Sequence, residues 1–241
     1  MNAICRICAV ALFVAGSTPA FAATISISQN PAWTYTTAGV SPTITNGNQM
    51  DGMRVTAVVS NGTSMLTLTQ AWTDSATPDT GGVSFVTPEF ALSVTGDTFE
   101  ANNWLLDFSN PSATGWRLLS LSLDGSSGQT VFDRTFGNSV GTPNSASGRD
   151  FAGFTTFSGS IGAFYSGAVG VGGNAPIGDI FASVLLSFGD GSFANALTAG
   201  RQYHFSLDTD NTTSALVPEP GSMLLLGSGL VGMATAFRRR R

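Results

Sequence analysis

The chain has 241 residues, of which 42% are hydrophobic and only 10% are charged. Its 15 acidic residues outnumber its ten basic residues, all of them arginine, and the formal net charge is −5. Four arginines close the chain and five are spread between Arg54 and Arg201, so no basic face can form, which excludes a nucleic-acid-binding protein.

The first 22 residues have the three parts of a secretory signal peptide. Met1 to Arg6 carries one positive charge, Ile7 to Ala15 is an apolar run of nine residues, and small residues follow at Ala20 and Ala22. Nine residues are too few to cross a bilayer as a helix. We therefore predict that signal peptidase removes residues 1–22 and that the mature protein begins at Ala23.

The only two cysteines, Cys5 and Cys8, both lie within this predicted signal. Their Cys-x-x-Cys spacing is typical of redox and zinc sites, but it would leave with the signal peptide. The mature protein is therefore expected to have no disulfide bond and no thiol nucleophile.

Residues 23–216 form a body of 194 residues, a length that commonly folds as one all-β domain. Short runs alternate between apolar and polar residues with the period of a strand, and no segment has a sustained helical period. We expect Ile180–Phe188, which is almost wholly apolar, to be a central strand. The expected strands are 24–28, 55–59, 66–69, 83–86, 90–94, 104–108, 119–123, 161–171, 180–188 and 203–207.

Turn-forming dipeptides separate these runs. Short strands with glycine-rich turns at this spacing are typical of an antiparallel β-sandwich or jelly roll. We predict a single domain of this kind over 23–216. The dipeptides are Asn46-Gly47, Asp51-Gly52, Asn61-Gly62, Gly81-Gly82, Asp124-Gly125 and Asp190-Gly191.

The body offers little that resembles a catalytic site. Ser139 lies in a Gly-x-Ser-x-Gly match and His204, the only histidine, follows it, but Thr142–Ser145 does not favour the helix that a nucleophile elbow requires. A glycosidase needs two facing carboxylates, and the sequence does not indicate which of the 14 acids in the body would face each other. We expect no catalytic residues, with a secreted hydrolase as an alternative.

One short segment has the spacing of a calcium loop. Asp208, Asp210 and Asn211 place oxygen ligands just after an expected strand, although the glycine and glutamate that complete an EF-hand are missing. Solvated turn residues are the simpler interpretation. The sequence requires no cofactor, and structural calcium at these residues is left as a hypothesis.

Four tryptophans, Trp33, Trp72, Trp104 and Trp116, are candidates for stacking against sugar rings, with Asn102, Asn103 and Asp107 near Trp104 to bind hydroxyl groups. Aromatic residues also favour strands, and 17 phenylalanines indicate that the core itself contains many rings. Packing in the core is therefore the competing interpretation, and a carbohydrate-binding module is an alternative function.

The last 25 residues have three parts in order: Val217-Pro218-Glu219-Pro220, an apolar segment over 221–237, and Arg238, Arg239, Arg240 and Arg241. As a helix, Ser222–Phe237 would span about 24 Å, slightly less than the hydrocarbon core of a bilayer. The positive-inside rule places the arginines in the cytoplasm and the body outside it. We therefore predict a single transmembrane helix.

This tail resembles the PEP-CTERM sorting signal of Gram-negative bacteria. The resemblance implies recognition of residues 217–220 by an exosortase, a membrane-embedded transpeptidase, with the arginines fixing the topology of the tail. It further implies an inner-membrane intermediate and then release to the cell surface or the extracellular space. Proteins with such tails often accompany exopolysaccharide and biofilm formation, so we expect a non-catalytic structural or adhesive protein that has exopolysaccharide as a candidate partner.

Overall fold

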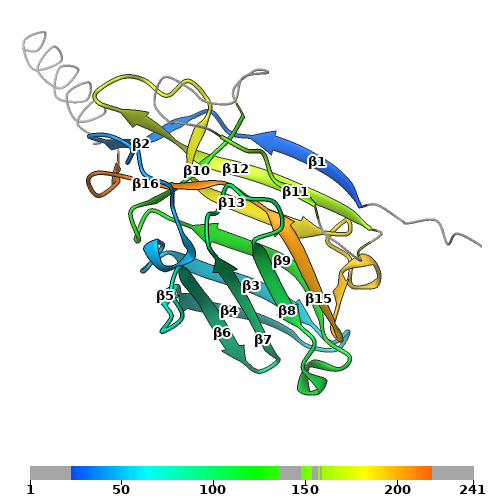
Figure 1. Ribbon diagram of the computed structural model, residues 1–241. Coiled ribbons are helices and arrows are strands. Elements are labelled where there is room, and N and C mark those ends of the chain that lie inside the picture. The colour runs from blue at the N-terminus through cyan, green and yellow to red at the C-terminus, as the bar shows by residue number, and fades with distance from the viewer. Residues whose placement is uncertain (1–22, 136–147, 154–156, 158, 219–241) are drawn as a thin grey trace, which may run out of the picture.

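The computed structural model describes residues 23–135, 148–153, 157 and 159–218. These residues form 17 β-strands and three short 3₁₀ turns, η1 (Gly47–Gln49), η2 (Pro111–Ala113) and η3 (Phe193–Asn195). Among them there is no α-helix, which confirms the predicted all-β fold. The strands form two sheets (Figure 1).

The larger sheet contains eleven strands, of which seven follow one path and four pair beside it. The path is β17 (Val217–Pro218), β2 (Trp33–Thr37), β12 (Ser160–Val171), β13 (Ile180–Phe188), β9 (Arg117–Asp124), β3 (Arg54–Ser60) and β4 (Met65–Ala71). The others are β1 (Thr24–Gln29) beside β12, β10 (Thr130–Asp133) beside β13, β16 (Thr209–Asn211) beside β10, and β14 (Leu197–Thr198) beside β9.

The smaller sheet contains six strands, and all its neighbours are antiparallel. Their order is β11 (Ala152–Gly153), β15 (Arg201–Ser206), β8 (Trp104–Phe108), β7 (Glu89–Thr95), β6 (Thr80–Val86) and β5 (Thr73–Asp74).

The inner faces of both sheets contribute to one hydrophobic cluster. Strand alternation directs Phe90, Leu92 and Val94 of β7 inward, and each fully buried side chain of this size contributes about 1.5–3 kcal/mol to folding. At the centre the rings of Trp72 and Trp104 lie 5.6 Å apart. Their indole N–H groups donate to backbone carbonyl oxygens of Gly47 and Leu207, so these buried polar atoms are paired.

The prediction of a purely antiparallel arrangement is wrong at one edge. Both β1 and β2 pair parallel with β12. More than a hundred residues separate these partners in the chain, and such a long connection allows parallel pairing. Pro31, which has no backbone N–H to donate to a ladder, lies between β1 and β2 and separates them.

The turn predicted at Gly81-Gly82 is also wrong, because both residues lie within β6. Gly81 is glycine for a different reason. A Cβ on it would overlap the carbonyl oxygen of Gly47 and the indole nitrogen of Trp72. By contrast, Gly62 has a φ of 87° and lies in the predicted turn between β3 and β4.

Candidate functional site

The body ends at an exposed sheet edge, where the predicted sorting motif begins. Leu216 is buried in a small apolar cluster with Val131 and Val169. The next two residues form β17, which pairs antiparallel with Thr36 and Tyr35 of β2. The side chain of Val217 is 54% exposed. The motif therefore starts one residue after Leu216, the last buried side chain among the described residues.

The remaining predicted processing residues lie outside the described residues. At the carboxyl end these are Glu219, Pro220 and Arg238, Arg239, Arg240 and Arg241, and at the amino end they are Ala20 and Ala22. Ala23, the predicted mature start, is the first described residue and directly precedes β1. No helix within the described residues is long and apolar enough to span a bilayer, and the segment 221–237 is not among them.

The predicted tryptophan platform needs correction. Trp72 and Trp104 are fully buried between the sheets, where aromatic packing leaves no ring face for a sugar. Trp116 is half-buried against the same core. Trp33 is 41% exposed on β2, and its indole N–H donates to the carbonyl oxygen of Tyr35. Only Trp33 among the four presents a large exposed surface.

The structure describes the acids and the histidine of the hydrolase hypothesis. The proposed nucleophile of that hypothesis, Ser139, lies outside the described residues. His204 is on β15, with its Nδ1 3.3 Å from the carbonyl oxygen of Asn102. Asp150 forms an ion pair with Arg134 at 2.8 Å. The serine-hydrolase arrangement therefore stays a prediction.

Two acids do line one cleft. Glu89 and Asp107 border a cleft of about 600 Å³ between β7, β8 and η2. Burial acts to raise the pKa of Asp107, but hydrogen bonds from Ser109 and Gln202 outweigh it and hold the pKa below its usual value. The general acid of a glycosidase needs a raised pKa, because it must carry a proton to the leaving group. With its lowered pKa, Asp107 fits the role of an ionised carboxylate and not that of a proton donor.

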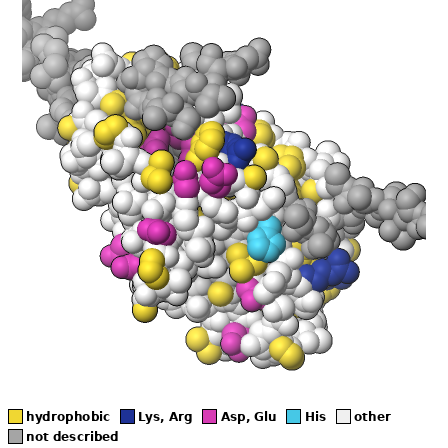
Figure 2. Space-filling model, viewed as in Figure 1, with side chains coloured by type: hydrophobic (Ala, Val, Ile, Leu, Met, Phe, Trp, Pro, Cys, Tyr) yellow, Lys and Arg dark blue, Asp and Glu magenta, His cyan; other side chains and the backbone are white. Residues whose placement is uncertain are grey.

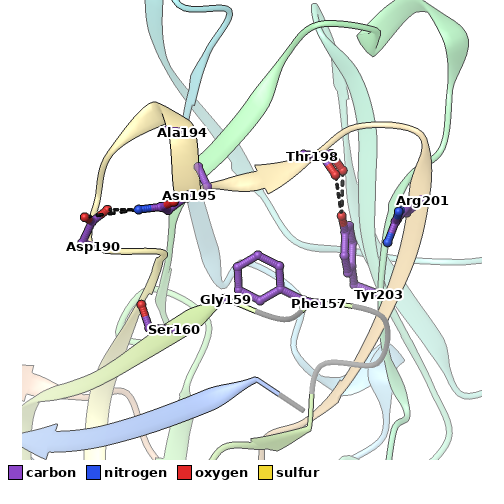
Figure 3. A pocket seen from close by; sticks show the side chains of 10 residues that line it. Phe157, Gly159, Ser160, Asp190, Ala194, Asn195, Thr198, Arg201 and Tyr203 are labelled. Atoms are coloured by element: carbon purple, nitrogen blue, oxygen red, sulfur yellow. Dashed lines mark hydrogen bonds between the residues drawn. The ribbon is translucent and has the colours of Figure 1, made fainter. Parts of the chain in front are cut away.

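A second cleft, of about 560 Å³, has an aromatic ring between polar walls (Figure 3). Asp190 and Asn195 lie on one side of the Phe157 ring, and Arg201 and Tyr203 lie on the other. The amide of Asn195 lies 3.4 Å from both carboxylate oxygens of Asp190. The Phe157 side chain is only 9% exposed and belongs to the core cluster, so the groups that this cleft offers to a ligand are chiefly the polar ones.

On the face shown in Figure 2, acidic side chains lie at several separate places, but a group of aspartates is buried. Asp208 precedes β16, Asp210 lies within it, and Asp133 ends the neighbouring strand β10. The backbone N–H of Asp133 donates to the carbonyl oxygen of Asp208 at 3.2 Å. The pairing of β10 with β16 thus brings Asp133 close to Asp208 and Asp210.

Asp208 and Asp210 line a narrow cleft of about 160 Å³ together with Asp97 and the loop 41–45. Asn211, the third predicted ligand, does not join them. It lines a different cleft with Gln49 and Gln129, because successive side chains of a strand point to opposite faces. The calcium hypothesis for Asp208, Asp210 and Asn211 as one set therefore needs correction at Asn211.

The field within this cleft is strongly negative. Burial, followed by the charges of Asp210, Asp133 and Asp97, raises the pKa of Asp208 to about 9. Burial also raises the pKa of Asp210, against the hydrogen bond to Asp133, and the charge of Asp97 adds to that increase. The described residues contain no group of three or more histidine, cysteine, aspartate or glutamate side chains that could hold a metal ion.

Sequence reasoning missed Asp97, Asp133 and Thr45 as neighbours of Asp208. Their positions in the chain carry no local signal, because each belongs to a different segment that only the fold brings to β16.

A family model described as the PEP-CTERM protein-sorting motif matches residues 216–241. No curated protein and no solved structure matches the chain.

Proposed function

We propose that this chain, which carries a PEP-CTERM sorting motif at its carboxyl end, is an exported surface or matrix protein with a non-catalytic β-sandwich body. The motif itself implies export, exosortase processing and delivery to the cell surface. The structural or adhesive role, in association with exopolysaccharide, is our proposal. The observation that carries it is the match over 216–241, which begins where the packed body ends.

The position of the motif supports processing after the body has folded. A membrane enzyme needs an extended and accessible segment, and β17 is a two-residue edge strand whose only partner in the described part of the chain is β2. Pro218 has no backbone N–H, which weakens that pairing further. Releasing β17 therefore costs few hydrogen bonds and leaves the core intact.

Replacing Glu219 by alanine should block removal of the tail, since this substitution changes the centre of the motif. Intact mass spectrometry of the protein recovered from its host is the measurement. The wild-type product should begin at Ala23 and lack Arg238–Arg241, whereas the variant should retain them and stay with the membrane fraction. As a matched control, Glu100→Ala removes an exposed acid of the body and should leave processing unchanged.

A wild-type product that reaches the surface with its terminal arginines still attached would contradict this proposal. So would a Glu219→Ala variant that is cut as efficiently as the control.

Carbohydrate binding is the second candidate, and the polar side chains of Asn195 and Arg201 in the cleft of about 560 Å³ favour it. If this cleft binds polysaccharide, Arg201→Ala and Asn195→Ala should each abolish most of the retardation in gels containing the host exopolysaccharide. Trp33→Ala tests the exposed tryptophan as a separate contact surface. Unchanged migration of the first two variants would exclude the cleft, and unchanged migration of all three would exclude both surfaces.

A further inference from the structure

Three buried oxygen atoms without a hydrogen-bond partner belong to residues that line the cleft beside β16. They are Thr45 Oγ1, Asp208 Oδ2 and Asp210 Oδ2. Thr45 is 2% exposed and Asp208 is 3% exposed, so water does not reach them freely. Buried polar atoms are nearly always satisfied by protein, ordered water or an ion. Three unsatisfied oxygens around one cleft therefore point to a ligand that accepts electron pairs.

The neutral hydroxyl of Thr45 is evidence independent of the acids. The loop that carries it is fixed by backbone hydrogen bonds, from Thr98 N to Thr45 O at 2.9 Å and from Ser41 N to Asn211 O at 2.7 Å. These bonds fix the backbone of the loop, and Thr45 Oγ1 is buried there without a hydrogen-bond partner. Protonation of nearby carboxyl groups does not explain this, because a hydroxyl can already donate a proton of its own.

The arginines near this cleft make other contacts. Arg134 forms its ion pair with Asp150 and lies over the ring of Tyr165. Arg149 donates to the carbonyl oxygen of Phe99 at 2.5 Å and lies over the Phe99 ring. The chain has no lysine. The charges facing Asp208 are instead those of Asp97, Asp133 and Asp210, all of one sign.

We propose that this cleft binds a calcium ion, with the carboxylates of Asp208 and Asp210 and the hydroxyl of Thr45 as ligands from the protein. Calcium accepts six to eight oxygen ligands in flexible geometry and commonly includes neutral oxygens and water among them. The site therefore needs no third acid. Zinc would favour nitrogen or sulfur ligands, and magnesium demands a near-ideal octahedron.

Two carboxylates and a partly hydrated ion correspond to the weak class of calcium sites, with a Kd of about 10⁻⁴ to 10⁻³ M. Extracellular modules use sites of this strength, because calcium outside the cell reaches such concentrations. The ion would join the loop 41–45 to β16. This inference concerns the body alone and does not depend on the role proposed for the tail.

The test is a calorimetric titration of the full-length chain, freed of metal with a chelator, against calcium chloride. A saturable heat in the millimolar range and a calcium-dependent rise in Tm are expected. Thr45→Val keeps the shape of the side chain and removes one ligand, so affinity should fall by roughly tenfold or more. Asp208→Asn should abolish the response, and Asp190→Asn, an exposed acid elsewhere, should leave it unchanged.

Absence of saturable heat and of any Tm shift in the wild-type protein would overturn the proposal, and this result does not depend on whether the variants fold. Equal weakening by Asp190→Asn would also overturn it, since it would indicate diffuse attraction to an acidic surface. A response to magnesium as strong as that to calcium would reject calcium as the ion.

Discussion

Replacing Gly81 by alanine should destabilise the protein by about 1–3 kcal/mol or more, the cost of forcing an extra group into a packed core. Gly81 lies in β6 directly against Gly47, whose carbonyl oxygen accepts the indole N–H of Trp72 at 2.8 Å. A Cβ at Gly81 would come within 2.8 Å of the Gly47 carbonyl carbon and would overlap both atoms of that hydrogen bond. Backbone atoms of η1 would have to move.

Gly162→Ala is the matched control, since Gly162 is also a strand glycine of the body. A Cβ there would lie 3.7 Å from Ser26 Oγ and 3.9 Å from Ser187 Cβ, which are ordinary contacts. Its effect on the free energy of unfolding should stay within about 1 kcal/mol. Urea unfolding of both variants, followed by tryptophan fluorescence, measures the difference. Equal stability of the two variants would contradict the close approach of η1 to β6.

The strands with clear alternation or continuous apolar character were predictable from the sequence. Trp104–Phe108 and Ile180–Phe188 have the same bounds in the structure as in the prediction, because each lies between two neighbouring strands and buries one face in the core. Arg54–Ser60 and Arg117–Asp124 extend their predictions by one or two residues at each end. Periodicity is a strong signal wherever burial enforces it.

The strands that the sequence did not reveal are short or polar. Trp33–Thr37 lies near an edge and is largely exposed, and Thr209–Asn211 consists of residues that favour turns as much as strands. Partners far along the chain hold these segments in place. Their pairing, including the parallel contacts of β1 and β2 with β12, depends on long-range register that no local pattern contains.

The candidate cation site was likewise predictable from the sequence only in part. The i, i+2 spacing of Asp208 and Asp210 is a local pattern, and the structure places both side chains at one cleft. Asn211 could have been excluded from sequence if 209–211 had been interpreted as a strand, since alternation places it on the opposite face. Thr45 and Asp97 could not have been found, because they reach β16 only through the fold.

Tryptophan shows why a residue type alone does not identify a site. Trp72 and Trp104 suit both a sugar platform and a core, and burial favours the core because each ring removes a large apolar area from water. Their indole N–H groups are paired with backbone carbonyl oxygens inside the core, so these polar atoms need no contact with solvent.

In a buffer that contains a chelator, the stability of the protein should fall as the pH rises from about 4 to about 9. The pKa of Asp208 is about 9 in the folded protein, because burial and neighbouring carboxylates oppose its ionisation. In the unfolded chain an aspartate has a pKa of about 4. Between these values the unfolded chain has released this proton and the folded protein still holds it, so a rising pH favours unfolding.

One such group contributes a loss of roughly 1 kcal/mol for each pH unit in this interval. Asp208→Asn removes the titrating group and keeps its shape, so the variant should be more stable than the wild type above neutral pH and should lose less stability with rising pH. Urea unfolding of both proteins at about pH 5 and about pH 8 measures the difference, and Asp190→Asn serves as the exposed control.

Parallel pH profiles for the wild type and Asp208→Asn would mean that Asp208 ionises without penalty, and the negative field assigned to this cleft would then be wrong. Calcium should have its largest effect at the upper end of the range, because there the ion competes with the fewest protons for the same oxygens.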